Sequence, residues 1–103
     1  MKKEADYDPV IALPSMFEVL LHPMAAKFLE KTDLEIASQI KKKLAELKEF
    51  PEQRGKHLRY TQFWTLRIGD YRAIYEINKN DGKIIVLYIG HRDSVYDDFS
   101  KIY

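Results

Sequence analysis

The chain has 103 residues, of which 46% are hydrophobic, and a formal net charge of +1 at pH 7. This length fits one small domain with one core, and the hydrophobic content excludes a wholly disordered chain. Cysteine is absent, which excludes disulfides and cysteine-based zinc sites, and because neither a membrane-spanning run nor a signal-peptide core is found, we expect a soluble, cytoplasmic protein.

The small net charge hides an asymmetry along the sequence. All five arginines lie at or after position 54, and residues 53–92 contain eight Lys or Arg against three Asp or Glu, a local charge of +5. The last eleven residues are acidic, with three Asp against one Lys. We expect the basic region either to attract a polyanion or to pair with the acidic tail.

Residues 1–15 contain two prolines and no sustained period, so we interpret them as a flexible N-terminal extension. A single domain at residues 16–103 follows. Its first element is a short, mostly apolar run at residues 16–21, which predicts a strand.

Two helices are predicted next. Pro23 fits the first position of a helix over about residues 23–31, because its missing N–H would have no partner there. Thr32 and Glu35 match a capping box at the start of a second helix, whose apolar stripe continues to about Phe50. The two helices are expected to form a hairpin.

Residues 51–60 form a polar, basic loop, and residues 63–77 then contain two alternating runs around Gly69 and Asp70. A two-residue Gly-Asp loop suits a type II′ hairpin turn. Counting outward from this turn places one set of side chains on a core-facing side: Trp64, Leu66, Ala73 and Tyr75.

The other side of the hairpin carries a chemical oddity. Thr65 faces Ile74, and Arg67 faces Arg72 directly. Like charges in that position cost about 0.2–1 kcal/mol unless something neutralises them. A bound anion would do so, and the alternative is pairing with acidic groups of the chain itself.

The apolar run at residues 83–90 predicts the most buried strand, after a turn in which Gly82 supplies positive φ. Residues 93–103 predict a short helix. The whole order predicts an α+β fold in which an N-terminal strand and an α-hairpin pack on a mainly antiparallel four-stranded sheet, with a short C-terminal helix. The register that would place Arg92 relative to Arg72 stays open.

Several catalytic signatures are absent from the sequence. There is no Gly-rich phosphate loop, no H-E-x-x-H and no G-x-S-x-G. The three histidines are too scattered to indicate a metal site, so no metal and no cofactor are expected. What remains is a group of arginines with aromatic residues, a combination typical of nucleic-acid sites.

These residues resemble the RelE branch of the RelE/ParE toxin superfamily over about residues 16–99. The resemblance is carried by Leu58-Arg59, Trp64, Leu66-Arg67, Gly69-Asp70-Tyr71-Arg72, Ile74-Tyr75, Gly90-His91-Arg92 and Val95-Tyr96.

The resemblance implies a toxin of a type II toxin–antitoxin pair, an endoribonuclease that cleaves mRNA in the ribosomal A site without a metal. In that reaction the ribose 2′-OH attacks the adjacent phosphate and leaves a cyclic phosphate and a 5′-OH. The implied partners are the ribosome with mRNA in its A site and a RelB-like antitoxin.

By position, Arg72 resembles the family arginine that holds the scissile phosphate, and Arg92 resembles the one given general-acid or charge-stabilising roles. Tyr96 is similar to the C-terminal tyrosine that orients or stacks on the substrate. Thr65 and Arg67 stand where well-studied members carry two lysines. From this resemblance we expect catalysis by Arg67, Arg72, Arg92 and Tyr96, with RNA contacts from Lys56, Arg59, Thr65 and His91.

The two replaced lysines leave the general base unassigned, because arginine stays protonated and threonine cannot substitute for lysine. Candidates are Lys56, His57, Tyr96 and His91, of which His91 is attractive because imidazole titrates near neutrality. Tyr60, where related sequences often carry Gly, is a further departure.

Two other functions stay open at this point. A ParE-like poison of a DNA topoisomerase would act by protein binding on the same fold. A non-catalytic binding domain would use its arginines structurally, in ion pairs with Glu76, Asp70 and the acidic tail.

Overall fold

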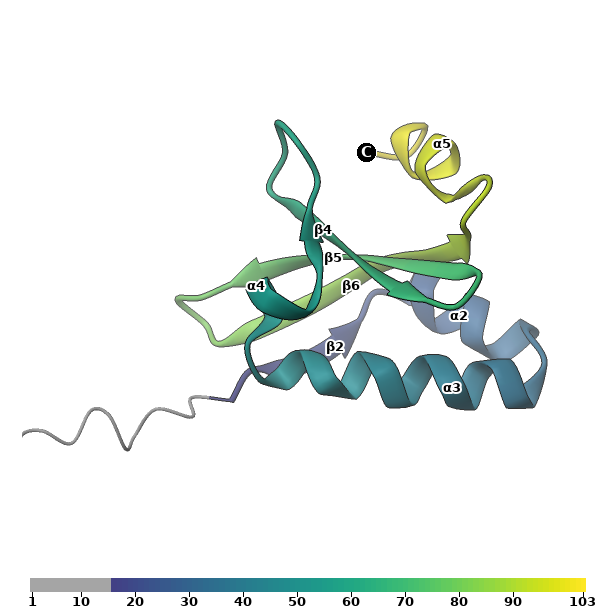
Figure 1. Cartoon of the computed structure of the whole chain (residues 1–103), viewed down its shortest axis with the longest axis horizontal. Helices are drawn as coiled ribbons and strands as arrows, with labels where there is room; N and C mark the ends of the chain where they lie inside the picture. The colour runs from purple at the N-terminus through teal and green to yellow at the C-terminus, as the bar shows by residue number, and fades with distance from the viewer. Residues whose placement is uncertain (1–15) are drawn as a thin grey trace, which may run out of the picture.

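The computed structural model describes residues 16–103, and the predicted extension at residues 1–15 lies outside the described part. The elements confirm the predicted α+β class and its order (Figure 1). They are β2 (Glu18–Leu21), α2 (Pro23–Lys31), α3 (Leu34–Ala45), the 3₁₀ turn η1 (Glu46–Lys48), α4 (Pro51–Arg54), β3 (Lys56–His57), β4 (Phe63–Ile68), β5 (Tyr71–Asn78), β6 (Lys83–His91) and α5 (Val95–Ser100).

Within the described residues the sheet has five strands in the order β2-β6-β5-β4-β3. The pair β2–β6 is parallel and the other pairs are antiparallel. Four strands were predicted. The fifth, β3, has only two residues and lies in the segment read from the sequence as a polar loop, because two residues are too few to show an alternating pattern.

The predicted hairpin is confirmed residue by residue. Ile68 pairs with Tyr71 and Arg67 pairs with Arg72 across β4 and β5. Gly69 has φ of 59°, and Asp70 is not among the positive-φ residues, as a type II′ turn requires.

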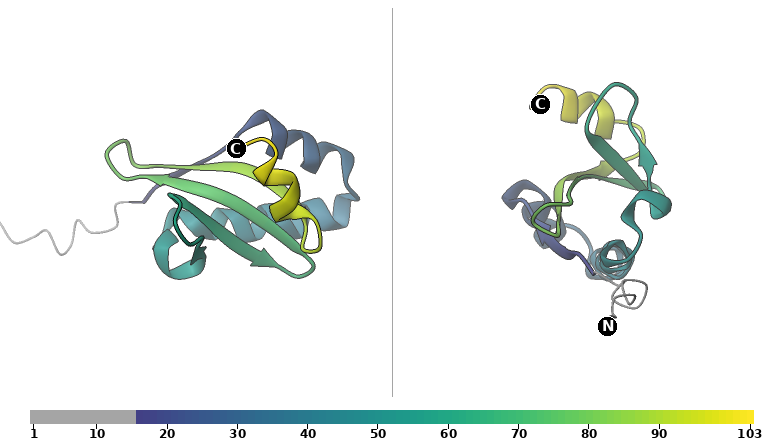
Figure 2. Two further views of the ribbon diagram at one scale, coloured as in Figure 1. Left: turned by 90° about the horizontal axis from the view of Figure 1, so that it is seen from above. Right: turned by 90° about the vertical axis from the view of Figure 1, so that its left-hand side faces the viewer.

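The α2–α3 hairpin covers one face of the sheet (Figure 2). This confirms the prediction that Leu66, Ala73 and Tyr75 face the helices. The buried residues of this main core are Ala25, Leu29, Ala37, Ile40, Leu44, Leu47, Leu66, Ile68, Ala73, Tyr75, Ile84, Val86 and Ile89. No helix in the described residues is long and apolar enough to cross a membrane.

The helix boundaries differ from the prediction in two places. Thr32 is not the cap of α3: its N–H donates to the Phe28 carbonyl at 3.1 Å and ends α2, so Asp33 caps α3 by accepting from Glu35 N at 2.8 Å. The second helix also ends earlier, at Ala45, and continues as η1.

The opposite face of the sheet carries a second, smaller core. Helix α5 lies across this face (Figure 2) and buries Val95 and Phe99 against Ile74 and Leu87. Arg67 and Arg72 lie on the same face, toward the β4–β5 turn. This face is therefore partly covered and partly open.

A bulge in β6 changes the parity of that strand. Ile74 pairs with Tyr88, but the next residue, Tyr75, pairs with Val86, so Leu87 is the extra residue. Val86 consequently belongs to the main core, whereas Tyr88 lies 6.2 Å from Phe99, ring to ring, beside the second core. Val86 and Tyr88 therefore lie on opposite faces of the sheet.

Candidate functional site: a basic face of the sheet

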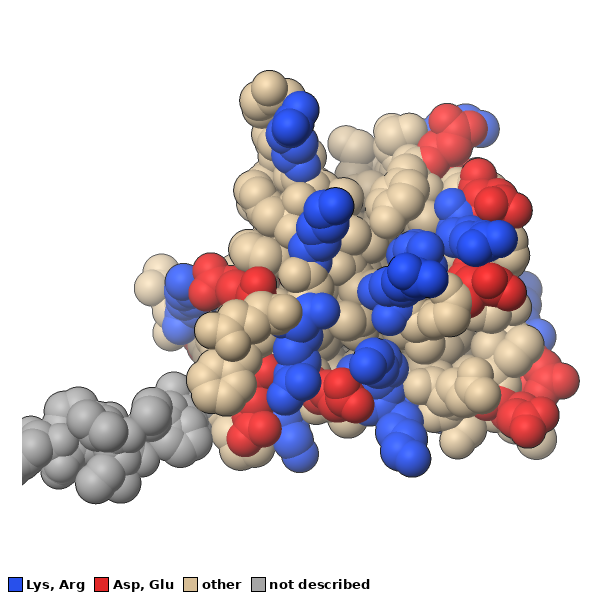
Figure 3. All heavy atoms as spheres, in the orientation of Figure 1, with Lys and Arg blue, Asp and Glu red and all other residues tan. Residues whose placement is uncertain are grey.

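Strand register brings four of the predicted site residues to one face. Lys56 pairs with Thr65 and Arg67 pairs with Arg72, and directly paired residues point to the same side of a sheet. Thr65 and Arg67 are two residues apart on β4, so both pairs share that side. Lys56 and Arg67 are exposed, and Lys and Arg side chains are prominent on the face of the molecule shown in Figure 3.

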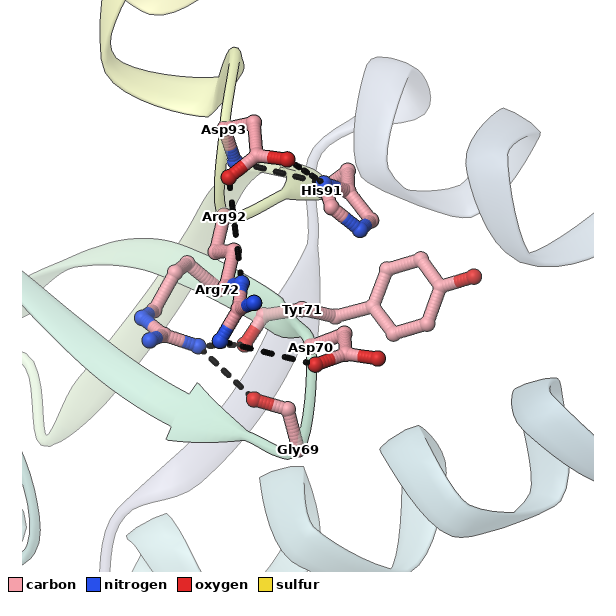
Figure 4. A network of polar contacts seen from close by, with 7 residues as sticks. All are labelled: Gly69, Asp70, Tyr71, Arg72, His91, Arg92 and Asp93. Carbon is pink, nitrogen blue, oxygen red and sulfur yellow. Dashed lines mark hydrogen bonds and ion pairs between the residues drawn. The ribbon is translucent and has the colours of Figure 1, made fainter.

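Arg72 is anchored on the hairpin turn. Its Nη1 donates to the carbonyl of Gly69 at 2.9 Å and to the carbonyl of Tyr71 at 2.8 Å (Figure 4). These bonds fix the guanidinium in place while its other N–H groups have no hydrogen-bond partner within residues 16–103. The guanidinium is therefore held in one position, with N–H donors that the described residues do not use.

The register also resolves where Arg92 lies. Gly90 pairs with Arg72, so Arg92, two residues later, continues the face of Arg72. Its main-chain N–H donates to the Asp70 carbonyl at 2.8 Å. Its guanidinium lies 3.8 Å from an Asp70 carboxylate oxygen and 3.7 Å from one of Asp93 (Figure 4).

A structural role in ion pairs therefore applies to only one of these three arginines. Arg92 has two acidic neighbours, but all three side chains are exposed, and ion pairs of this kind contribute little to stability. Arg72 bonds to carbonyls, and within residues 16–103 neither Arg67 nor Lys56 forms an ion pair. The directly opposed Arg67 and Arg72 thus have no carboxylate at ion-pair distance among residues 16–103.

Tyr96 reaches this face from α5. Its hydroxyl lies 3.1 Å from Thr65 Oγ1, which connects α5 to β4. The Tyr96 side chain is 41% exposed, whereas Thr65 is buried. The aromatic ring therefore stands at the border between the second core and the open basic end, where an approaching ligand can reach it.

The structure does not bring the two candidate histidines to this face. His91 pairs with Tyr71 and lies with it on the helix side, 5.8 Å ring to ring, and its Nδ1 accepts from Asp93 N at 3.2 Å (Figure 4). His57 packs on Trp64 with a ring separation of 4.9 Å. Arg59 lies in the loop between β3 and β4.

A structural support for Lys56 was missed from the sequence. The buried Tyr75 hydroxyl donates to the carbonyl of Pro51 at 2.7 Å, and a Cβ at Gly55 would overlap this hydroxyl. Burial, with a smaller contribution from the Glu52 carboxylate, raises the pKa of Tyr75 to about 12. This contact holds the chain just before Lys56 against the sheet. The sequence signal for this support is Gly55, which is flanked by two basic residues.

Metal ligands are not grouped in the described part of the chain: residues 16–103 contain no cluster of three His, Asp or Glu side chains that could hold a metal ion.

Comparisons with known proteins give a consistent family. Residues 19–96 match the model of the ParE toxin of the type II toxin–antitoxin system parDE. Among curated proteins, no sequence matches the chain.

Solved structures share the fold. The RelBE2 toxin–antitoxin complex from Mycobacterium tuberculosis matches with a TM-score of 0.69 and 25% identity, over 75% of this chain and 92% of that one. A mutant of the E. coli toxin RelE in the free state matches with a TM-score of 0.68 and 25% identity, over 84% and 97%. The chromosomal ParDE system of P. aeruginosa matches at 16% identity with a TM-score of 0.64, over 75% and 97%, which shows the fold alone.

Proposed function

Because the chain belongs to the RelE/ParE superfamily of toxins from type II toxin–antitoxin systems, we propose that it is a ribosome-dependent endoribonuclease that cleaves mRNA in the A site. The observation that carries this proposal is the pair Arg67 and Arg72, directly opposed on the sheet and without a compensating carboxylate in the described residues. A scissile phosphate would supply the missing negative charge.

The reaction requires two things of this face. The ribose 2′-OH must lose its proton as it attacks the adjacent phosphate, and the charge that builds on the phosphate must be stabilised. Arg72, fixed by the turn carbonyls, holds the phosphate. Arg67 and Arg92 add positive charge from either side, and in this proposal Arg92 stabilises the charge on the leaving oxygen.

Two titratable groups beside Thr65 are the candidates for the proton acceptor. Lys56 is the direct cross-strand neighbour of Thr65, and the Tyr96 hydroxyl bonds to the same Thr65. His57 and His91 lie on the helix side of the sheet, so their imidazoles do not face the phosphate in this arrangement. We assign the general base to Lys56 or Tyr96.

An antitoxin is the second partner of this proposal. The similar structures include RelE toxins in complex with RelB antitoxins, from Pyrococcus horikoshii and Methanococcus jannaschii among others. A small RelB-like protein encoded next to this chain would neutralise it. Co-expression of the neighbouring reading frame should restore growth to cells that express the toxin.

The experiment that tests the activity is Arg72→Ala assayed on translating ribosomes. We expect mRNA cleavage to fall at least a hundredfold, on the order of 3 kcal/mol of transition-state stabilisation, while the free energy of unfolding changes by less than about 1 kcal/mol. The matched control is Lys79→Ala, which removes an exposed cation paired with Glu52 just beyond the far end of β5. Undiminished cleavage by Arg72→Ala would contradict the proposal.

A second candidate function is favoured by the family model, which describes a ParE toxin. In that case the protein would poison a DNA topoisomerase by binding it. Inhibition of gyrase supercoiling by the purified protein, with no ribosome present and no mRNA cleavage in the ribosome assay, would support this function instead.

A further inference from the structure

The loop between β3 and β4, residues 58–62, projects from the sheet on the same side as α5 (Figure 1). Its conformation is held by internal hydrogen bonds. Leu58 N donates to Phe63 O at 2.9 Å, and the Thr61 hydroxyl donates to Leu58 O at 2.8 Å and accepts from Phe63 N at 3.0 Å. His57 Nε2 lies 2.6 Å from Thr61 O. The loop is therefore built to hold its tip in one position.

Tyr60 at this tip belongs to neither core of the described residues. Its φ of 64° lies in the left-handed region, which is unfavourable for a bulky side chain and favours glycine or asparagine. The side chain is 93% exposed, so it buries almost no apolar surface in return. Of the other described residues, Phe50 shares the positive φ, but it is less exposed, at 63%.

The neighbours of Tyr60 indicate which ligand the ring would meet. The Arg59 guanidinium carbon lies 5.9 Å from the centroid of the Tyr60 ring, and Lys56 precedes the loop on β3. Both cations are exposed, and neither forms an ion pair within the described residues. Lys and Arg side chains continue from this loop toward α3 on the face shown in Figure 3.

We propose that Tyr60 stacks on an unpaired base of single-stranded RNA while Arg59 binds an adjacent phosphate. This contact lies outside the basic face that carries the reaction, and it rests on the proposed function, since it gives the same RNA substrate class a second attachment point. An exposed ring with a cation beside it matches how proteins bind single-stranded RNA.

A protein partner fits the loop less well. Aromatic anchors at protein interfaces lie within apolar, desolvated patches, whereas the exposed neighbours of Tyr60 are Arg59, Thr61 and Gln62. Every base has a flat face for stacking, so a rigid exposed ring accepts RNA without requiring such a patch.

The test compares three variants of the full chain: Tyr60→Gly, Tyr60→Asn and Tyr60→Phe. Gly and Asn both suit the backbone but remove the ring, and Phe keeps the ring without the hydroxyl. The probe is a fluorescent single-stranded RNA of about 12 nucleotides, 2′-O-methylated to prevent cleavage, and binding is measured by anisotropy alone and on ribosomes programmed with it.

We expect the Kd of Tyr60→Gly and Tyr60→Asn to rise about tenfold and that of Tyr60→Phe to stay within about twofold of the wild type. Arg59→Ala should reduce the slope of log Kd against log salt by about one, as loss of a phosphate contact does. Equal affinities for Tyr60→Gly and the wild type in both formats, or no RNA binding by the wild type, would overturn the proposal.

The outcomes also separate this inference from the proposed function. Cleavage that depends on Arg72, together with RNA affinity that does not depend on Tyr60, overturns only the inference. RNA affinity that depends on Tyr60, without any cleavage, overturns only the nuclease. If Tyr60→Gly weakens antitoxin binding and leaves RNA affinity unchanged, the loop is a protein contact and the inference is wrong.

Discussion

The two faces of the sheet differ in how much of each is buried. On the helix side, thirteen buried residues of α2, α3, η1 and the sheet form one core, whereas the core between α5 and the other side has four. The first face gives the molecule its stability. The second is covered only as far as α5 reaches, and its open end holds the opposed arginines Arg67 and Arg72 and the ring of Tyr96.

This difference shows where the chain can tolerate an unfavourable arrangement. Two guanidiniums in direct register cost a few tenths to 1 kcal/mol, and a core of thirteen buried residues easily offsets such a cost. The stability of the helix side therefore allows the other face to keep two like charges in direct register. Three changes test this division.

The largest effect is expected from Ile40→Ala, which breaks the helix side. Ile40 is fully buried on α3, and truncating such a side chain leaves a cavity that costs about 2–5 kcal/mol. Chemical denaturation followed by circular dichroism measures the loss. RNA affinity of the folded fraction should not change, because the basic face is untouched, and a loss below about 1 kcal/mol would contradict the assignment of this core.

An intermediate effect is expected at alkaline pH from Tyr75. Its pKa is raised to about 12 from an ordinary value of 10.0, so the folded state keeps the phenol proton that the unfolded state has lost. The resulting stability is fully present below pH 10 and is lost as the pH rises to about 12, a fall of about 2–3 kcal/mol.

The matched variant for this titration is Tyr75→Phe. It loses the hydrogen bond to the Pro51 carbonyl and about 1 kcal/mol at neutral pH, but the alkaline fall should be shallower than in the wild type. Parallel denaturation series at several pH values measure the difference, in which the titration of the remaining tyrosines and lysines cancels. If the free energy of unfolding falls equally steeply with pH in both proteins, Tyr75 does not titrate as assigned.

The smallest effect is expected from Arg67→Thr, which relieves the like-charge pair. The free energy of unfolding should rise by about 0.2–1 kcal/mol at low salt, and the gain should shrink at high salt because exposed charges are screened. Thermal unfolding at two salt concentrations measures it. Destabilisation by this change would mean that Arg67 supports the fold instead of opposing it.

Much of this arrangement could be predicted because its signals are local. Two alternating runs around Gly69 and Asp70 define a hairpin without reference to the rest of the chain, and the opposed arginines follow from counting. Pro23 marks the start of α2 for the same reason. The class of fold follows from the order of such elements.

The remaining features depend on long-range contacts. The bulge at Leu87 appears only when β6 is aligned with β5, and the cover of α5 over Ile74 requires a helix to fold back on the sheet. Strand β3 is two residues long and is held through Tyr75, twenty-four residues from its partner Pro51. The position of His91 beside Tyr71, on the helix side of the sheet, likewise depends on strand pairing that residue types do not determine.

The parallel pairing of β2 with β6 has a consequence for the order in which the protein can be made. Glu18 lies opposite Lys83, roughly 65 residues away along the chain, and contacts of such separation form slowly. Strand β6 is synthesised after the β4–β5 hairpin and joins β2 to it. Arg92 and Tyr96 follow β6, so a nascent chain has neither the joined sheet nor these two side chains until Tyr96 has left the ribosome.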